Sequence, residues 1–190
     1  MAEPRGKGGH FGLSEADKNR LLHIARTTIE RRAQGLEIPS FQVTSEILKR
    51  ELGVFVTIHK GEALRGCIGF IQGFKPLFRA VREMAAAAAF QDPRFPPVSS
   101  EELASLKLEI SVLTPLRKVR EVSEIEVGEH GIYIVREAYA GLLLPQVATE
   151  YGWDRTAFVQ QTCLKAGLPQ DAWRDPQTEI YIFSADIFSE

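Results

Sequence analysis

The feature that most constrains how this chain can fold is a sequence of predicted strands and helices that occurs twice. In the first half, a hairpin pattern at 53–70 precedes a helix pattern, an Asp-Pro loop and a strand at 106–114. In the second half, a hairpin pattern at 131–145 precedes helix patterns, another Asp-Pro loop and a strand at 178–188. Hairpins pair antiparallel strands, whereas a doubly wound parallel sheet needs crossover connections. The order predicts an α+β fold, mostly antiparallel, with two subdomains that arose by weak internal duplication.

Helix signals flank these patterns. Ser14 is a predicted N-cap for a helix that stops at Gly35, and Thr44 is a predicted cap for a shorter helix through Leu52. Pro76 suits the start of the helix that follows the first hairpin. We therefore expect a flexible tail at residues 1–12, followed by one domain at 13–189 made of two intertwined α+β subdomains.

Composition excludes several classes of function. The 190 residues carry 23 Lys and Arg against 25 Asp and Glu, so the formal net charge is −2. This balance does not favour a general nucleic-acid or membrane surface. A nucleic-acid surface on the first predicted helix would use five cationic residues: Lys18, Arg20, Arg26, Arg31 and Arg32. Acidic residues are interleaved with them, so a solvated helix face is the simpler interpretation.

The chain also lacks the signals of secretion and of common cofactor sites. No apolar run has the length of a membrane helix, and residues 1–11 lack the apolar core of a signal peptide. With only two cysteines, a disulfide framework is excluded and a reduced, cytoplasmic setting is expected. The chain has no Cys-x-x-Cys pair, no closely spaced histidines, no Walker A motif and no Gly-x-Gly-x-x-Gly. We therefore expect it to bind neither a metal nor a cofactor.

The stretch LRGCIG is the densest candidate for a functional site. Gly66 and Gly69 weaken a strand unless a bulge or a close approach of backbone or ligand requires them. Arg65 would share a face with Cys67 in a regular strand, and a nearby guanidinium favours the reactive thiolate. Cys67 is thus a candidate nucleophile and Arg65 a candidate anion ligand. Alternatively, Cys67 is a small packing residue, since free cysteine is often buried.

The stretch QDPRFPP is a second candidate. Its three prolines restrain the backbone and would hold Asp92 and Arg94 in defined directions, as suits ligand binding. The alternative is a stiff connector in which Asp92 caps a turn.

The second half contributes three further candidates. His130 precedes a predicted strand and could act as a general base near neutral pH. Gln146 and Glu150 are spaced i,i+4 on a predicted helix, so an amide and a carboxylate would share one face. A surface histidine and an ordinary solvated helix face are the alternatives.

Seven motifs together resemble the AMMECR domain family over residues 14–189. They are LRGCIG, AAAAAFQDPRFPP, LEISVLTP, HG-x-Y, GLLLPQVATEYGW, TCLKAGLP and AWRD, in this order. The resemblance implies an α+β fold of two subdomains but no particular reaction. It carries over to every residue of LRGCIG and departs at Phe70-Ile71-Gln72, where members more often have Thr-Phe.

The resemblance also implies partners. Microbial members are often encoded beside a radical S-adenosylmethionine (radical SAM) protein and a Memo-like protein, so the chain is predicted to be a component of that system. In an enzyme, Cys67 would attack, Arg65 would orient an anionic substrate, and His130 or Glu150 would move protons. In a non-catalytic module, Arg65 and Arg94 would anchor a small anionic ligand or a partner segment.

Overall fold

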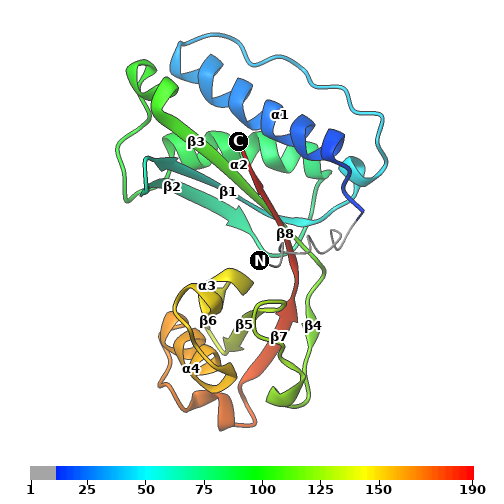
Figure 1. Cartoon of the computed structure of the whole chain (residues 1–190), viewed down its shortest axis with the longest axis vertical. Coiled ribbons are helices and arrows are strands. Elements are labelled where there is room, and N and C mark those ends of the chain that lie inside the picture. The colour runs from blue at the N-terminus through cyan, green and yellow to red at the C-terminus, as the bar shows by residue number, and fades with distance from the viewer. Residues whose placement is uncertain (1–11) are drawn as a thin grey trace, which may run out of the picture. The chain divides into compact units, whose positions relative to one another are not determined.

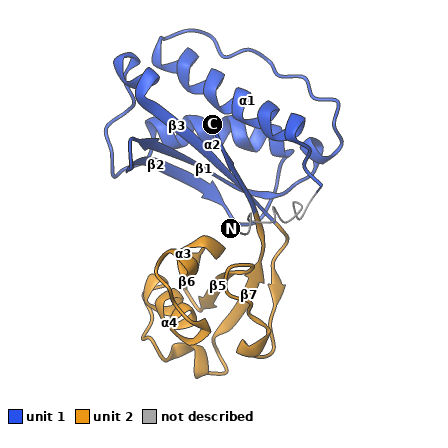
Figure 2. Ribbon diagram, viewed as in Figure 1, with its two compact units in different colours: residues 1–113, 186–190 blue, residues 114–185 orange. Residues whose placement is uncertain are grey.

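The protein, described by a computed structural model over residues 12–190, forms two compact units (Figure 2). Unit 1 comprises the chain through Leu113 together with residues 186–190, and unit 2 comprises residues 114–185. All but the last residue of the tail predicted at 1–12 lies outside the described residues.

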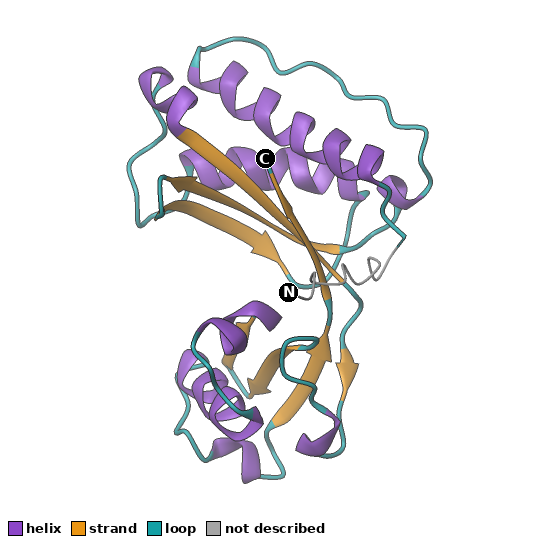
Figure 3. Cartoon of the chain, in the orientation of Figure 1, coloured by secondary structure: helices purple, strands orange, loops and turns teal. Residues whose placement is uncertain are grey.

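Unit 1 is a four-stranded sheet covered by two helices (Figures 1 and 3). The sheet order is β2-β1-β3-β8, and β1 pairs antiparallel with both β2 and β3. The elements of unit 1 are α1 (Glu15–Ala33), the 3-10 turn η1 (Ile47–Lys49), β1 (Gly53–Lys60), β2 (Ala63–Phe70), α2 (Leu77–Phe90), the 3-10 turn η2 (Ser100–Ser105), β3 (Leu106–Leu113) and β8 (Ala185–Ser189).

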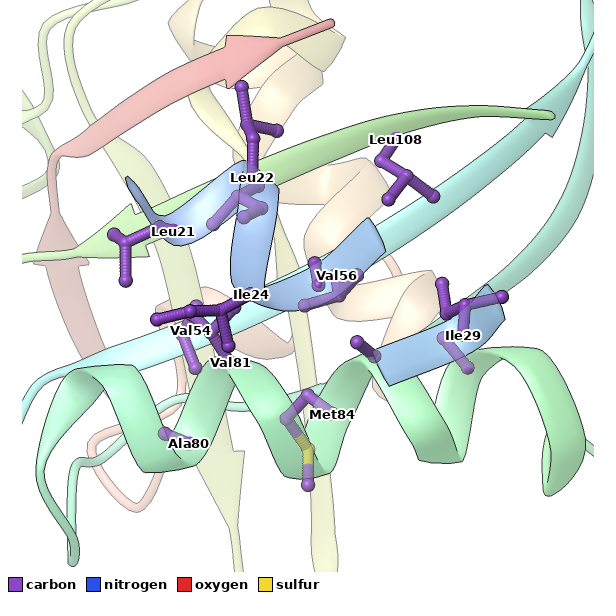
Figure 4. Packing of buried hydrophobic residues seen from close by; sticks show 14 of the residues in the cluster. Leu21, Leu22, Ile24, Ile29, Val54, Val56, Ala80, Val81, Met84 and Leu108 are labelled. Atoms are coloured by element: carbon purple, nitrogen blue, oxygen red, sulfur yellow. The ribbon is translucent and has the colours of Figure 1, made fainter. Parts of the chain in front are cut away.

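Alternation along the strands separates the two faces of this sheet. Val54 and Val56 are fully buried, as is Leu108 on β3, and they pack with residues of α1 and α2 such as Ile24 and Val81 (Figure 4). Residues at the intervening positions point to the opposite face. Along β3, Lys107 and Glu109 alternate with buried apolar residues, so one face is covered by helices. The alternation in burial ends at Ser111, which is also buried.

Short side chains allow α2 to approach the sheet closely. The alanine run at 85–89 is buried, and a Cβ on Gly66 of β2 would lie 2.2 Å from the carbonyl oxygen of Ala88. A side chain at residue 66 would force the helix and strand apart. The run is therefore a packing surface.

Unit 2 contains a second antiparallel sheet, of order β4-β7-β5-β6. Its core includes the fully buried side chains of Ile132, Phe158 and Cys163. The elements of unit 2 are β4 (Arg117–Lys118), the 3-10 turn η3 (Val122–Glu124), β5 (Gly131–Arg136), β6 (Tyr139–Leu143), α3 (Pro145–Glu150), α4 (Arg155–Lys165), the 3-10 turn η4 (Ala172–Arg174) and β7 (Glu179–Phe183).

The predicted α+β class with antiparallel sheets is confirmed. Each unit places the first strand of a hairpin between its hairpin partner and a later strand: β1 lies between β2 and β3, and β5 between β6 and β7. This shared order agrees with the repeated sequence pattern, while its origin by duplication stays a prediction.

The helix predicted from Thr44 through Leu52 is wrong. Only the 3-10 turn Ile47–Lys49 forms there. The backbone oxygen of Arg50 accepts a hydrogen bond from Leu77 N at 2.9 Å, and Glu51 forms an antiparallel bridge with Pro76. These contacts hold the segment extended, because bonding to a distant part of the chain outweighs a weak local helix preference.

The single strand predicted at 178–188 is also wrong. It divides into β7, which belongs to the unit 2 sheet, and β8, which belongs to the unit 1 sheet. At the division, Ser184 N donates to Thr114 Oγ1 at 2.8 Å and Ser184 O accepts from Thr114 N at 2.9 Å. The apolar pattern continues through both strands, so sequence alone does not reveal the change of sheet.

No helix in residues 12–190 combines the length and hydrophobicity needed to cross a lipid bilayer.

Candidate functional site

The backbone of Cys67 lies on an edge strand whose outward hydrogen-bonding groups are covered by side chains. β2 pairs only with β1 in the described sheet. Asp92 Oδ2 accepts from Cys67 N at 2.9 Å, and Arg94 Nη2 donates to Cys67 O at 3.2 Å. We name these two side chains the edge clamp. The clamp occupies groups that would otherwise be open to pairing with another strand.

Asp92 and Arg94 also bind each other. Asp92 Oδ2 accepts from Arg94 Nη2 at 2.7 Å, while Oδ1 accepts from Arg94 Nε at 2.9 Å and from Arg94 N at 3.1 Å. The Arg94 guanidinium beside Asp92 holds the pKa of that carboxyl well below its usual range. Asp92 is 4% exposed, whereas the Arg94 side chain is 53% exposed. The clamp therefore presents a cation at the surface, next to Cys67.

Three polar residues lie in a row across the sheet on the face opposite the helices. In the strand register, Thr57 of β1 is opposite Cys67 of β2 on one side and Glu109 of β3 on the other. Directly opposed residues in antiparallel strands share a face. We name this face, defined by Thr57, Cys67 and Glu109, the open face. Thr57 Oγ1 donates to Cys67 Sγ at 3.3 Å, and all three residues are partly exposed.

Sequence reasoning missed Thr57 and Glu109 as site residues. Each occupies a polar position in an alternating strand, which is a signal that they leave the core. The signal could not show that the two positions are opposed, because register depends on pairing between distant segments.

Arg65 lies apart from the regular pairing. A bulge between Ile58 and His59 leaves it without an opposed partner in β1, so the regular strand that would align it with Cys67 does not form. Its Nε and Nη2 donate to Glu102 at 3.0 and 2.9 Å, and the residue is 8% exposed. Within residues 12–190, the buried Nη1 has no hydrogen-bond acceptor. An anion or a water molecule would satisfy it.

Glu102 joins the bulge to the segment before β3. Hydrogen bonds from Arg65 lower the pKa of Glu102 to about 2. We expect Glu102→Gln to reduce the free energy of unfolding by about 2 kcal/mol at pH 7, because the variant leaves a largely buried guanidinium without its counter-ion. Since the folded pKa is depressed, this stabilisation is present above the ordinary value of 4.5 and is lost as the pH falls towards 2.

Chemical denaturation at several pH values checks this prediction. Lys60 also contacts Glu102, at 3.1 Å, but its side chain is 50% exposed, so Lys60→Gln is a control with a small expected effect. A Glu102→Gln variant whose loss of stability is the same at pH 7 and pH 3 would contradict the assigned role of the carboxylate.

The two glycines of LRGCIG have packing roles. Gly66 faces the α2 backbone, and a Cβ on Gly69 would lie 2.3 Å from the Val54 oxygen and 2.5 Å from the Phe55 ring. Both positions thus require close approach within unit 1, one of the reasons predicted for a glycine in a strand. Their proposed contact with a ligand stays a prediction.

The remaining candidates belong to unit 2. His130 Nδ1 accepts from Glu126 N at 3.1 Å, and His130 lines a cavity of about 220 Å³ together with Arg117. Gln146 is partly buried, and its Oε1 has no hydrogen-bond donor within residues 12–190. Glu150 is exposed at the end of α3. In unit 1 the structure brings Cys67, Asp92 and Arg94 together, and the cooperation of His130 or Glu150 with Cys67 stays a prediction.

Among the described residues, no group of three or more His, Cys, Asp or Glu side chains is arranged to hold a metal ion. The chemistry that the geometry supports at the open face is that of a thiol hydrogen-bonded by a hydroxyl, with a guanidinium nearby.

Comparisons with known proteins agree on one family and one fold. The family model AMMECR1 matches residues 22–188. Protein NEQ441 of Nanoarchaeum equitans is 44% identical over 177 residues, covering 90% of this chain and 98% of that protein. Protein TK0174 of Thermococcus kodakarensis is 46% identical, covering 90% of this chain and 88% of that protein.

A solved structure supports the same conclusion. The crystal structure of protein PH0010 from Pyrococcus horikoshii superimposes with a TM-score of 0.83 at 42% identity, covering 90% of this chain and 89% of that one. The names of these relatives state no activity. The comparisons therefore establish ancestry and fold, and function is argued from the site.

Proposed function

Because the chain belongs to the AMMECR1 family, we propose that its open face binds a small anionic molecule at Cys67, as one component of a multi-protein system. The observation that carries this proposal is the hydrogen bond from Thr57 Oγ1 to a partly exposed Cys67 Sγ, beside the half-exposed Arg94.

The surroundings of Cys67 leave the residue accessible to reagents. It is partly exposed, and its sulfur accepts a hydrogen bond from Thr57 on the open face. Cys163 provides the internal contrast, because it is fully buried and burial raises the pKa of its thiol. The two cysteines should therefore differ greatly in reactivity.

Arg94 supplies the affinity for an anion. Asp92 neutralises part of its charge and orients its guanidinium by accepting two hydrogen bonds, from Nε and Nη2. A planar guanidinium fixed in this way suits recognition of a carboxylate or phosphate. Arg65, whose Nε and Nη2 bind Glu102, has a secondary role in this proposal and supports the strand that carries Cys67.

The proposed partners are a radical SAM protein and a Memo-like protein, in a cytoplasmic setting. This part of the proposal comes from the family resemblance. In such a system the AMMECR1 domain would bind or present an intermediate, and a partner would carry out the main chemistry.

A second candidate function is a non-catalytic binding module. Within residues 12–190, the only hydrogen bond to the Cys67 sulfur comes from Thr57, and no histidine or carboxylate bonds to it. A thiol without a hydrogen-bonded base suits ligand binding as well as attack. Reactivity of the sulfur distinguishes the two functions.

We expect iodoacetamide to alkylate Cys67 in the folded protein at least about tenfold faster than Cys163 at neutral pH. Mass spectrometry of each cysteine-containing peptide measures both rates in one sample. Thr57→Val should slow alkylation of Cys67 by about threefold or more, because it removes the donor without changing the side-chain shape. Addition of the radical SAM and Memo-like proteins of the same genome should protect Cys67.

Arg117→Gln serves as the matched control for Arg94→Gln, because Arg117 lies in unit 2 and contacts Glu124. Only Arg94→Gln should slow the reaction at Cys67. If Cys67 stays unmodified until the protein unfolds, thiolate chemistry is ruled out and the binding module remains. If neither partner protects Cys67, the proposed system is contradicted at this site.

A further inference from the structure

A separate groove on unit 1 is formed by helices and by the segment that follows α1, away from Cys67. Its volume is about 700 Å³, within the range of small-molecule sites. We name it the helix groove, and its lining residues come from α1, residues 38–42 and α2 with the lysine before it: Thr28, Arg32, Ile38, Ser40, Phe41, Gln42, Lys75, Phe78, Arg79, Arg82, Glu83 and Ala86.

Positive charge dominates this lining. Four cationic residues and one carboxylate line the groove, and Glu83 forms an ion pair with Lys75. Arg32, Arg79 and Arg82 have no carboxylate partner among the described residues. Three guanidinium groups that share a groove repel one another unless an anion is bound.

Aromatic rings support two of these cations and form part of the wall. The Arg79 guanidinium carbon lies 5.7 Å from the centroid of the Phe78 ring, and that of Arg32 lies 5.1 Å from the Phe90 ring. Such contacts orient a guanidinium without neutralising it. Phe41 and Phe78 also give the groove apolar surface.

The other cations of α1 are already bound elsewhere in unit 1. Lys18 pairs with Glu15 and Arg26 with Glu190, while Arg20 and Arg31 donate to backbone oxygens of Gln42 and Glu37. Of the five cationic residues of the first helix that could have formed a nucleic-acid surface, the side chains of all except Arg32 therefore form ion pairs or hydrogen bonds within the described part of unit 1. A local cluster without an extended stripe favours a small ligand over a polynucleotide.

We propose that the helix groove binds a small organic phosphate. Its phosphate groups would be held by the guanidinium groups of Arg32, Arg79 and Arg82, and its apolar or aromatic part would pack against Phe41 and Phe78. Arg79 and Arg82 are three residues apart on α2, so they flank the same stretch of groove, while Arg32 reaches it from α1. Ser40 and Gln42 supply polar groups at the rim. This site is independent of the open face, which is built from strands.

Isothermal titration calorimetry of the full chain tests the proposal with ADP, pyrophosphate and adenosine as probes. We expect ADP to bind with a Kd below about 100 µM, pyrophosphate to bind about tenfold more weakly, and adenosine to show no binding at about 1 mM. Arg82→Glu and, on the opposite wall, Arg32→Glu should each weaken ADP binding by at least about tenfold, since each replaces an attraction by a repulsion.

Arg50→Glu is the matched control, because Arg50 is exposed in unit 1 but does not line the groove. It makes the same change in net charge and should leave ADP binding unchanged. Cys67→Ala should also leave it unchanged, so failure at the open face is distinguishable from failure here. Circular dichroism of each variant confirms that unit 1 is folded.

Four results would overturn the proposal. They are no ADP binding at about 1 mM, equal weakening by Arg50→Glu and Arg82→Glu, adenosine binding as tight as ADP, and pyrophosphate binding as tight as ADP. Binding of a single-stranded RNA oligonucleotide more tightly than ADP would contradict a small-molecule occupant.

Discussion

Replacing Gly66 with alanine should destabilise unit 1 by about 3 kcal/mol or more. The added Cβ would lie 2.2 Å from the Ala88 oxygen, and the neighbour that must move is helix backbone, not the end of a flexible side chain. Either α2 moves away from the sheet or β2 is displaced. Each movement exposes part of a core that includes the buried alanines of α2.

Hydrogen exchange at the amides of β1 is the measurement suited to this prediction. Both tryptophans, Trp153 and Trp173, lie in unit 2, so their fluorescence does not report on unit 1. Cys67→Ala is the control in the same strand: it shortens a partly exposed side chain on the open face and should cost much less. Equal protection of β1 in Gly66→Ala and the unmodified protein would contradict the close approach of α2.

Asp92→Ala should destabilise unit 1 by about 3 kcal/mol at pH 7. Asp92 is almost fully buried, and its loss leaves two backbone donors, Cys67 N and Arg94 N, without their acceptor. It also removes the counter-ion of Arg94. We further expect faster aggregation, because the edge of β2 would be open to pairing with another chain.

The effect of Asp92→Ala depends on pH with a definite sign. The pKa of Asp92 is depressed in the folded state, mainly by the Arg94 guanidinium. The stabilisation is therefore present above the ordinary pKa of 3.8 and is lost as the pH falls below it. Hydrogen exchange at β1 amides, at pH 7 and pH 3, should show a difference between variant and unmodified protein that narrows in acid.

Arg94→Gln is the matched control for the charge alone. The Arg94 side chain is half-exposed, so its removal should cost about 1 kcal/mol or less after screening by solvent. If Arg94→Gln destabilises the unit as much as Asp92→Ala, the backbone hydrogen bonds of Asp92 are not the main contribution.

The candidate site shows which functional residues can be predicted from local sequence patterns and which cannot. The sequence indicated LRGCIG and QDPRFPP as the two unusual stretches, and the structure joins them through Asp92, Arg94 and Cys67. It did not indicate Glu102, which binds Arg65 across 37 residues, or Thr57, which binds the Cys67 sulfur. Glu102 lies in an ordinary-looking segment. The alternation around Thr57 indicates only that its side chain leaves the core, not which residue it contacts.

Local physics therefore determined much of the framework from the sequence alone. The Ser14 cap and the turn between β1 and β2 depend on neighbouring residues, and both appear in the structure as predicted. The helix expected after Thr44 failed because a distant contact, between Arg50 and Leu77, outweighed local preference.

Only the tertiary structure decided which strands pair, in what register, and where β7 ends and β8 joins another sheet. Strand pairing and register bring Arg65 to Glu102 and Cys67 to Thr57. Helix packing places three arginines around one groove: Arg32, Arg79 and Arg82. Pairing and packing join segments far apart in the chain, and their free energies depend on contacts that no single segment contains.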